Sequence, residues 1–441
     1  MTSKSLHMAN AFDGAGFDDL DGTAQDLIRR REAVLAPSYR LFYRHPVVAV
    51  RGEGVWLYDG SGNRYLDAYN NVPAVGHSHP HVRRLVDEQL GVLNTHTRYL
   101  TEPVIAYSER LLALFPAELT KVVYTCTGSE AVDLALRIAR YETGAQGIIC
   151  TSHAYHGTTT AAAAISPSLG SNNRIGDDVA LVAAPDTQRE DPTRLAEDFA
   201  DRVRMAIADL RARGAGFAGM IVDSIMSSDG LQSDPEGFLA PAARVVREAG
   251  GLWIADEVQP GFGRLGSVWW GFQRHDLKPD LVVLGKPMGN GIPIGAVVGR
   301  DDVMTKFGQD IRYFNTFGGN PVSIAAATAV LDVIEDEHLL DNVQQSGRRL
   351  LDGLREIAAR HPGIGGVRGC GLFTAMEFVD GDAPGAATAA WVVNELRDRR
   401  ILISASGPHE NVLKIRPPLP FTTEHADQLL SELDDALAHA P

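Results

Sequence analysis

Lys286 is the residue of this sequence best suited to covalent chemistry. It follows the apolar run of residues 280–285, and Gly and Pro flank it. A lysine at the edge of a buried strand can be desolvated so that its pKa falls, which suits Schiff-base formation with a carbonyl group. The simpler interpretation is that Lys286 is an ordinary solvated residue of a surface loop, as most lysines are. The buried-strand context argues against it here.

A carboxylate in a similar position precedes Lys286 by about thirty residues. Asp256 ends the apolar segment 251–256. Open α/β sheets place ligands at the carboxyl ends of their strands, and a buried carboxylate must be paired. Asp256 could pair with the protonated ring nitrogen of pyridoxal 5'-phosphate (PLP), the usual way proteins tune that cofactor. A metal ligand or a structural salt bridge with Arg264 explains this segment equally well.

Three further segments carry groups that could bind a phosphate or an aromatic ring. Gly128 permits a tight turn before a helix that opens at Ser129, where free N–H groups and the helix dipole favour an anion. Thr316 lies in the Gly-rich residues 315–321, which offer further donors. Tyr155 could stack on a ring. The simpler interpretations are an ordinary helix N-cap at Gly128 and Ser129, a turn before a helix at Thr316, and a loop in which Tyr155 has only a packing role.

Strand-like and helix-like segments alternate between about residues 75 and 325. The strand-like runs are residues 121–127, 146–152, 179–184, 218–223, 251–256, 280–285 and 295–299. Near-continuous apolar strands are typical of a mostly parallel sheet that helices cover on both faces. We therefore predict an α/β fold, with a large domain built on a mostly parallel central sheet and a small α+β domain made from both chain ends.

The same pattern predicts domain boundaries. Residues 1–24, rich in Gly, Asp, Ser and Ala, are predicted to be a mobile tail. Residues 25–74 form the N-terminal part of the small domain, residues 75–325 the large domain that binds the cofactor, and residues 326–441 the C-terminal part of the small domain.

Composition excludes several classes of protein. The net charge of -15 disfavours binding to nucleic acid. The three cysteines lack the spacing of a disulfide framework or a zinc site and suit a reducing cytoplasm. No apolar run approaches the length of a membrane span. We expect a cytoplasmic protein that binds neither nucleic acid, membrane nor metal.

Taken together, these motifs resemble the class III aminotransferase family, PLP enzymes of fold type I. The match runs from about residue 35 to 435 and is strongest in residues 256–264 (DEVQPGFGR) and 286–291 (KPMGNG). The resemblance implies that Lys286 forms the Schiff base with PLP and then moves protons. It also implies that Asp256 holds the ring nitrogen protonated, that Val258 packs against the ring and that Gln259 lies near the ring hydroxyl.

The resemblance implies roles for four more residues. Tyr155 would stack on the opposite face of the ring, while Gly128 and Ser129 would bind the cofactor phosphate. Thr316 would reach that phosphate from a partner subunit. A homodimer is then the minimum functional unit, and a tetramer is the larger alternative.

The reaction is indicated by a departure from the family pattern. Family members that act on amino acids commonly clamp a carboxylate with an arginine three residues before a Pro-Pro pair, where this chain has Lys414. Their glutamate-proline is replaced by Asp223 and Ser224. Lysine lacks the planar fork that grips a carboxylate, so the substitution is not conservative.

The PLP-dependent phospholyases of the same family share these departures and the segments 65–72 (YLDAYNNV) and 411–415 (NVLKI). This resemblance implies β-elimination of phosphate from a phosphorylated amine, with ethanolamine phosphate giving acetaldehyde, ammonia and phosphate. Candidates for binding the substrate phosphate are Arg40, Asn71 and His77. Arg40 could equally be a surface charge, and His77 a structural residue.

Two other functions compete with this one. The first is an aminotransferase that moves an amino group to pyruvate or another keto acid. The second is a PLP-fold binding module without activity, whose signature would be loss of the lysine. Lys286 is present.

Overall fold

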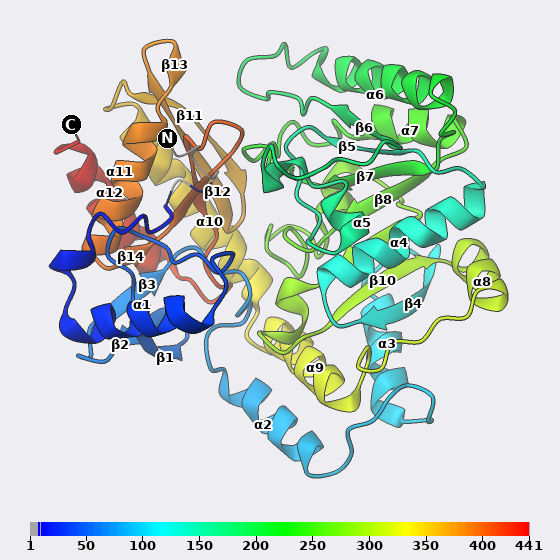
Figure 1. Cartoon of the computed structure of the whole chain (residues 1–441), viewed down its shortest axis with the longest axis horizontal. Coiled ribbons are helices and arrows are strands. Elements are labelled where there is room, and N and C mark those ends of the chain that lie inside the picture. The colour runs from blue at the N-terminus through cyan, green and yellow to red at the C-terminus, as the bar shows by residue number, and fades with distance from the viewer. Residues whose placement is uncertain (1–7, 9, 441) are drawn as a thin grey trace.

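The computed structural model describes residue 8 and residues 10–440 of the chain. Its largest sheet has seven strands in the order β4-β10-β9-β8-β7-β5-β6 (Figure 1). The strands are β4 (Leu119–Thr125), β5 (Ile148–Thr151), β6 (Val179–Val182), β7 (Gly219–Asp223), β8 (Leu252–Asp256), β9 (Leu281–Leu284) and β10 (Gly295–Arg300). Each of the seven predicted runs overlaps one of them, and five contain the whole strand; β4 begins two residues before the run 121–127, and β10 ends one residue after the run 295–299. β10 runs antiparallel to both of its neighbours, and β5 to β9 pair in parallel.

Both faces of this sheet are buried. In β8, Ile254 packs into the core on the side of α4 (Gly128–Thr143), whereas Trp253 packs into the core on the side of α6 (Leu195–Ala212) and α7 (Ala240–Glu248). Because successive side chains of a strand point to opposite faces, a sheet covered on both sides needs apolar residues at every position. That requirement explains why the strands read as continuous apolar runs.

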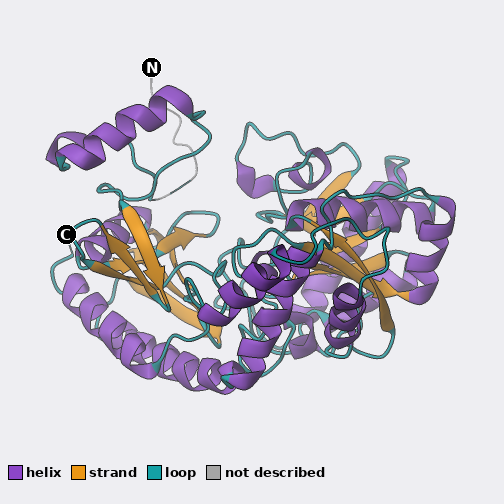
Figure 2. Ribbon diagram, turned by 90° about the horizontal axis from the view of Figure 1, so that it is seen from below, coloured by secondary structure: helices purple, strands orange, loops and turns teal. Residues whose placement is uncertain are grey.

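Two smaller sheets are built from the two ends of the chain. The first joins β1 (Ala49–Glu53), β2 (Trp56–Asp59), β3 (Arg64–Asp67) and β14 (Ile401–Leu402), and β14 pairs in parallel with β3. The second joins β11 (Ile364–Cys370), β12 (Phe373–Asp380), β16 (Val412–Ile415) and β15 (Ser404–Ser406), with β13 (Ala383–Pro384) beside β12. In Figures 1 and 2 these strands form a group apart from the large sheet, and α12, near the end of the described chain, lies with this group. The predicted fold class is confirmed.

Helices fill the remaining connections. They are α1 (Gly22–Val34), α2 (Pro80–Leu90), α3 (Glu102–Leu112), α5 (Thr160–Ala163), α8 (Asp301–Asp310), α9 (Pro321–Asp336), α10 (Leu339–Ala358), α11 (Ala386–Asp398) and α12 (Thr423–Leu437). The predicted domain boundary at residues 325 and 326 falls inside α9, so a continuous helix crosses it. Every helix in the described part of the chain is too short or too polar to traverse a lipid bilayer.

The predicted mobile tail, residues 1–24, is only partly covered, because residues 1–7 and 9 lie outside the described residues. Within the described part, Asn10 is buried, and its carbonyl accepts a hydrogen bond of 2.6 Å from the Tyr43 amide. The Asn10 side chain accepts a bond of 3.2 Å from Ser404 Oγ. This part of the tail therefore packs onto the small domain, and its mobility stays a prediction.

Candidate active site

The carboxyl ends of five strands meet around one cavity. β4, β5, β7, β8 and β9 end beside it, as expected where ligands bind in open α/β sheets. The cavity measures about 320 Å³, a size typical of small-molecule sites. Its lining includes Gly128, Ser129, Tyr155, Asp256, Val258, Gln259 and Lys286. The structure thus brings together seven of the eight residues to which the resemblance assigns a cofactor role.

Lys286 directly follows β9 and starts a short 3-10 helix, Lys286–Gly289. Its φ of +23° is unusual for a residue with a side chain, and such strain is common where function fixes a geometry. The pKa of its ammonium is lowered to about 8, chiefly by burial and then by the charge of Arg416, while Asp256 and Asp223 oppose the shift. Much more of this amine is therefore free base near neutral pH than of an ordinary lysine, and imine formation requires the free base.

Asp256 ends β8, next to β9 in the sheet. Its Oδ2 lies 2.7 Å from His156 Nδ1, and its Oδ1 accepts a bond of 3.0 Å from the Val258 amide. Arg264 does not pair with it; that guanidinium donates to the carbonyls of Leu372 and Pro417. Among the described residues, no group of three or more His, Cys, Asp or Glu side chains is placed to hold a metal ion. The salt-bridge and metal interpretations of Asp256 therefore lack support.

Glu257, the next carboxylate, serves the fold instead. It is fully buried and accepts bonds from the amides of Gly271 (2.7 Å) and Phe272 (2.9 Å) and from Ser224 Oγ (2.6 Å). Burial raises its pKa to about 8. Because successive residues of a strand point in opposite directions, Asp256 faces the cavity and Glu257 faces away from it.

Glycines let three backbone segments approach one another closely at the start of α4. A Cβ on Gly285 would lie 3.0 Å from the backbone of Gly128, and one on Gly157 would lie 2.5 Å from Ser129 Oγ. The N-cap of α4 is Thr127, and Ser129 Oγ accepts a bond of 3.1 Å from the Thr158 amide. The backbone approaches closely here, beside the positive end of the helix dipole, so this corner of the cavity suits a phosphate group.

A chain of hydrogen bonds links Gln259 to its surroundings. Its amide nitrogen donates to Ser227 Oγ at 2.5 Å, and Ser227 Oγ donates to Asp223 Oδ2 at 2.5 Å. Arg416 donates to the side-chain Oε1 of Gln259 and to the Tyr69 backbone carbonyl. Neither Arg416 nor Lys414 makes an ion pair with a carboxylate of the residues that the structure describes. Neither residue therefore serves as a salt-bridge partner within the described part of the small domain.

Lys414 lies beside a second, polar cavity of about 220 Å³. Asn10, Tyr69, His153, Ser404 and Ser406 are among the residues that share its lining. The pKa of Lys414 is lowered to about 7, first by burial and then by the charge of Arg416; Lys286 lowers it further and Asp223 opposes the shift. Lys414 is therefore within electrostatic reach of groups that line the first cavity.

The other predicted residues lie elsewhere. Thr316 is exposed and outside the cavity lining, as is Arg40. Asn71 is buried, and its Nδ2 donates to the Gln259 carbonyl at 3.3 Å. His77 Nε2 lies 2.7 Å from Asp67 Oδ2, and its ring packs against Gly52, which fits a structural role. A single chain therefore gathers neither Arg40, Thr316 nor His77 at the cavity.

Sequence reasoning missed His156, Ser227 and the position of Lys414. His156 follows Tyr155 directly, and its spacing from Asp256 gives no hint of contact. Ser227 lies in an irregular loop after β7. Lys414 carried a signal, because a lysine replaces the arginine of the family pattern; the fold brings it within electrostatic reach of Asp223 and Lys286.

A lysine and an aspartate at adjacent strand ends, next to a glycine-lined corner at a helix N-terminus, define a PLP enzyme of fold type I. The family model for class III aminotransferases matches residues 40–437. The chain belongs to this family, and PLP is its cofactor.

Individual relatives are similar over nearly the whole chain. A phospholyase from Arthrobacter, solved in complex with phosphoethanolamine, is 44% identical, with a TM-score of 0.91 over 94% of this chain and 100% of that chain. Ethanolamine-phosphate phospho-lyase homolog 1 of Caenorhabditis elegans is 36% identical over 94% of this chain and 93% of its own length. The alanine--glyoxylate aminotransferase 2-like protein of Drosophila melanogaster is 38% identical over 92% and 85%.

The contact between His156 and Asp256 generates a prediction. His156→Leu leaves the buried carboxylate with one backbone donor, and losing a hydrogen bond to a charged group costs about 1.5–3 kcal/mol. We expect the dissociation constant of PLP, measured by absorbance titration of the apoprotein, to rise at least about tenfold. His81→Leu is the matched control, because His81 contacts Asp332 at the same 2.7 Å outside the cavity. Equal PLP affinity in the two variants would contradict the role of His156.

Proposed function

We propose that this protein is a phospholyase that eliminates phosphate from a small phosphorylated amine, with ethanolamine phosphate as the substrate. The observation that carries the proposal is Lys414. A compact cation replaces the arginine fork of the family pattern and lies beside a polar cavity within electrostatic reach of Lys286. The similarity to the Arthrobacter phospholyase and to the Caenorhabditis elegans homolog supports it.

The residues of the first cavity supply the proton chemistry. PLP, when bound, draws electrons away from the carbon that carries the substrate nitrogen. Asp256, fixed by His156, supplies a negative charge for the cofactor ring nitrogen. Lys286 Nζ, whose pKa is lowered to about 8, removes the proton from that carbon. The neighbouring carbon–oxygen bond then breaks, and with one water the products are acetaldehyde, ammonia and phosphate.

The second cavity suits the leaving phosphate. Lys414 provides a positive charge, and Ser404 and Ser406 provide hydroxyl groups; the carboxylate of Glu410 also lies in the lining and opposes an anion. Asn10 Nδ2 and Ser406 Oγ are buried and have no hydrogen-bond partner among the residues that the structure describes. Unsatisfied buried donors are costly, so they favour a ligand rich in acceptor oxygens. A phosphate dianion has such oxygens, and it needs no arginine fork.

The assay that tests the proposal omits any keto acid. With PLP and ethanolamine phosphate alone, we expect phosphate and acetaldehyde to be released in equal amounts over many turnovers. The aminotransferase, which the Drosophila melanogaster relative favours, needs an acceptor instead. If no phosphate appears until an amino donor and pyruvate are supplied, and alanine then accumulates, the lyase assignment is wrong.

Lys414 generates a pH prediction. A lysine with a lowered pKa is charged below that pKa and neutral above it, so Lys414 in the free enzyme loses its charge as the pH rises through about 7. Inorganic phosphate becomes more negative over the same pH range, so its own ionisation should not weaken its attraction to a cation. We expect the inhibition constant of inorganic phosphate to increase between pH 7 and 9, and Lys414→Met to weaken inhibition about tenfold and remove this increase. Lys306→Met, at the surface, is the control. Unchanged inhibition in Lys414→Met would contradict the assignment.

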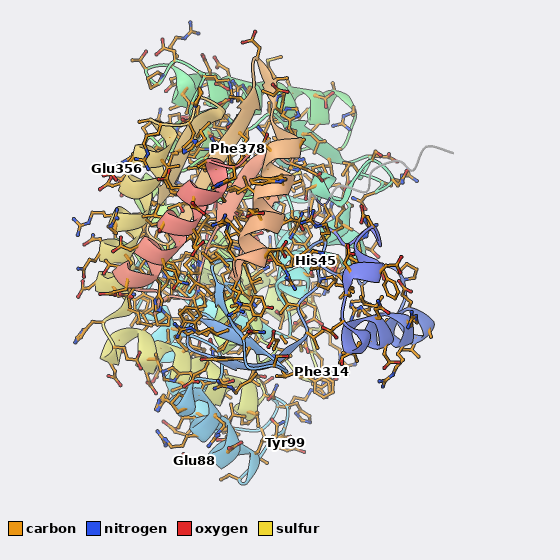
Figure 3. All side chains as sticks on the ribbon, turned by 90° about the vertical axis from the view of Figure 1, so that its left-hand side faces the viewer. His45, Glu88, Tyr99, Phe314, Glu356 and Phe378 are labelled. Atoms are coloured by element: carbon orange, nitrogen blue, oxygen red, sulfur yellow. The ribbon has the colours of Figure 1, made fainter. Side chains whose placement is uncertain are left out.

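We also propose a homodimer, to which Thr316 contributes from the partner subunit. Large apolar side chains are exposed in residues 90–105 and 314–317, with Leu100 at 96% and Val92 at 80%. Tyr99 and Phe314 lie near each other at one edge of the molecule in Figure 3, and both contact the ring of His96. An exposed apolar surface of this kind supports an interface at this place, and Thr316 stands between two of its residues in the chain, Phe314 and Phe317.

Light scattering tests the assembly. We expect a mass of two or four chains for the wild type, and a shift toward single chains with lower activity for Leu100→Glu. Met205→Glu, an equally drastic change at an exposed position of α6, should leave the mass unchanged. A wild-type mass of one chain would refute the homodimer.

A further inference from the structure

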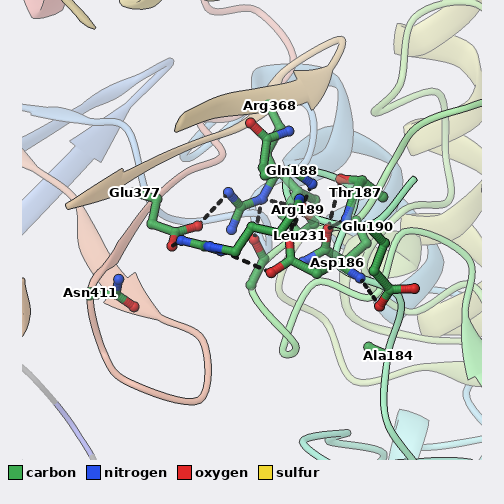
Figure 4. A network of polar contacts seen from close by, with 12 residues as sticks. Ala184, Asp186, Thr187, Gln188, Arg189, Glu190, Leu231, Arg368, Glu377 and Asn411 are labelled. Atoms are coloured by element: carbon green, nitrogen blue, oxygen red, sulfur yellow. Dashed lines mark hydrogen bonds and ion pairs between the residues drawn. The ribbon is translucent and has the colours of Figure 1, made fainter. Parts of the chain in front are cut away.

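A network of charged side chains joins the C-terminal sheet to the large domain, outside the catalytic cavity (Figure 4). Arg368 lies on β11 and Glu377 on the neighbouring β12, and Arg368 Nη1 donates to Glu377 Oε2 at 2.8 Å. Arg189, in the loop after β6, donates to the other oxygen of Glu377 at 2.5 Å and to Asp186 at 2.9 Å. Arg368 is 5% exposed, whereas the side chain of Arg189 is 55% exposed.

The buried arginine also holds a loop of the large domain. Arg368 Nε donates to the backbone carbonyls of Gly230 at 2.9 Å and Leu231 at 2.7 Å. The loop that follows β7, residues 224–232, contains two non-glycine residues with positive φ, Met226 at +49° and Leu231 at +66°. Such conformations are strained and persist only where the surroundings hold them. Arg368 is one of the groups that hold this loop.

The same loop supports two walls of the catalytic cavity. Ser227 bonds Asp223 and Gln259, which both line that cavity. Asp229 accepts a bond of 2.7 Å from Thr151 Oγ1 and one of 3.0 Å from the His153 amide. The segment that starts at His153 continues to the cavity residues 155–157. Both the Gln259 side and the Tyr155 side of the site therefore depend on this loop.

We propose that Arg368 is a positioning residue: from the C-terminal sheet it fixes the 224–232 loop, and through Ser227 and Asp229 it fixes the cavity walls around the cofactor. Arg368 itself lies outside the cavity lining. A buried ion pair seldom adds stability over apolar packing, since desolvation offsets the attraction between the charges. The planar guanidinium of Arg368, by contrast, fixes the position of the loop relative to β12, because it binds two adjacent loop carbonyls and the Glu377 carboxylate at once.

The first test uses Arg368→Gln without cofactor. Hydrogen exchange of the apoprotein should become faster in residues 224–232 and 153–157, while the strands of the large sheet stay protected. PLP binding should weaken about tenfold, and kcat of the protein saturated with cofactor should fall about tenfold. Arg189→Gln is the matched control. It removes the hydrogen bond from the exposed Arg189 to Glu377 and leaves the contacts of Arg368 with the loop intact.

A double mutant separates positioning from general damage. If Arg368 acts through Ser227, the loss of kcat in Arg368→Gln/Ser227→Ala should be smaller than the product of the two single losses. Arg368→Lys keeps the charge but not the fork, so it should fold and still show faster exchange of the loop. Unchanged loop exchange and PLP affinity in a folded Arg368 variant, or fully multiplicative losses in the double mutant, would overturn the proposal.

Discussion

The burial of one amine opposite one carboxylate governs the rest of this structure. Lys286 follows β9 and Asp256 ends β8, so two adjacent parallel strands deliver them to the same edge of the sheet. Burial lowers the pKa of Lys286 to about 8, while the charge of Asp256 works against that shift. Burial makes the amine of Lys286 more reactive by favouring its neutral form. The nearby carboxylate of Asp256 limits this shift. The apolar strands and the helices on both faces exclude water from the sheet beneath the pair.

Several features of the molecule follow from keeping this pair fixed while leaving room for a ligand. His156 contacts Asp256 and fixes its carboxylate, and the hydrogen bond between Gln259 and Ser227 fixes another part of the cavity wall. Glycines at positions 128, 157 and 285 let three backbone segments approach closely at the start of α4. The end of β16 brings Lys414 and Arg416 toward this side of the molecule, and the charge of Arg416 adds to burial in lowering the pKa of both Lys286 and Lys414. The charge around the reactive amine is therefore set both by the large sheet, through Asp256 and Asp223, and by the end of β16, through Arg416.

The parts of this account that sequence could predict are those set by local pattern. The seven strands of the large sheet were predictable because each is a short apolar run with turn residues beside it, and Lys286 and Asp256 were predictable because each ends such a run. The parallel pairing of β14 with β3, across more than 300 residues, fits the prediction of a domain made from both chain ends, but no local signal sets its register.

Contacts between distant loops could not be predicted. His156 and Asp256 are 100 residues apart, and Arg368 reaches Gly230 across 138. Their residue types suit many roles, and only the fold decides which partners they meet. The substrate candidates illustrate the same limit: His77 lies against Asp67 and Arg40 on the surface, whereas Lys414, noted for its departure from the family pattern, lies beside the polar cavity.

The central claim is that Lys286, and not another buried amine, carries the cofactor. Lys414 is the natural rival, because its pKa is also lowered, to about 7. Borohydride reduction of the protein with bound PLP fixes the covalent bond, and mass spectrometry of the digested protein then locates the modified lysine. We predict a single pyridoxyl group on Lys286. A pyridoxyl group on Lys414, or none on any lysine, would contradict the account.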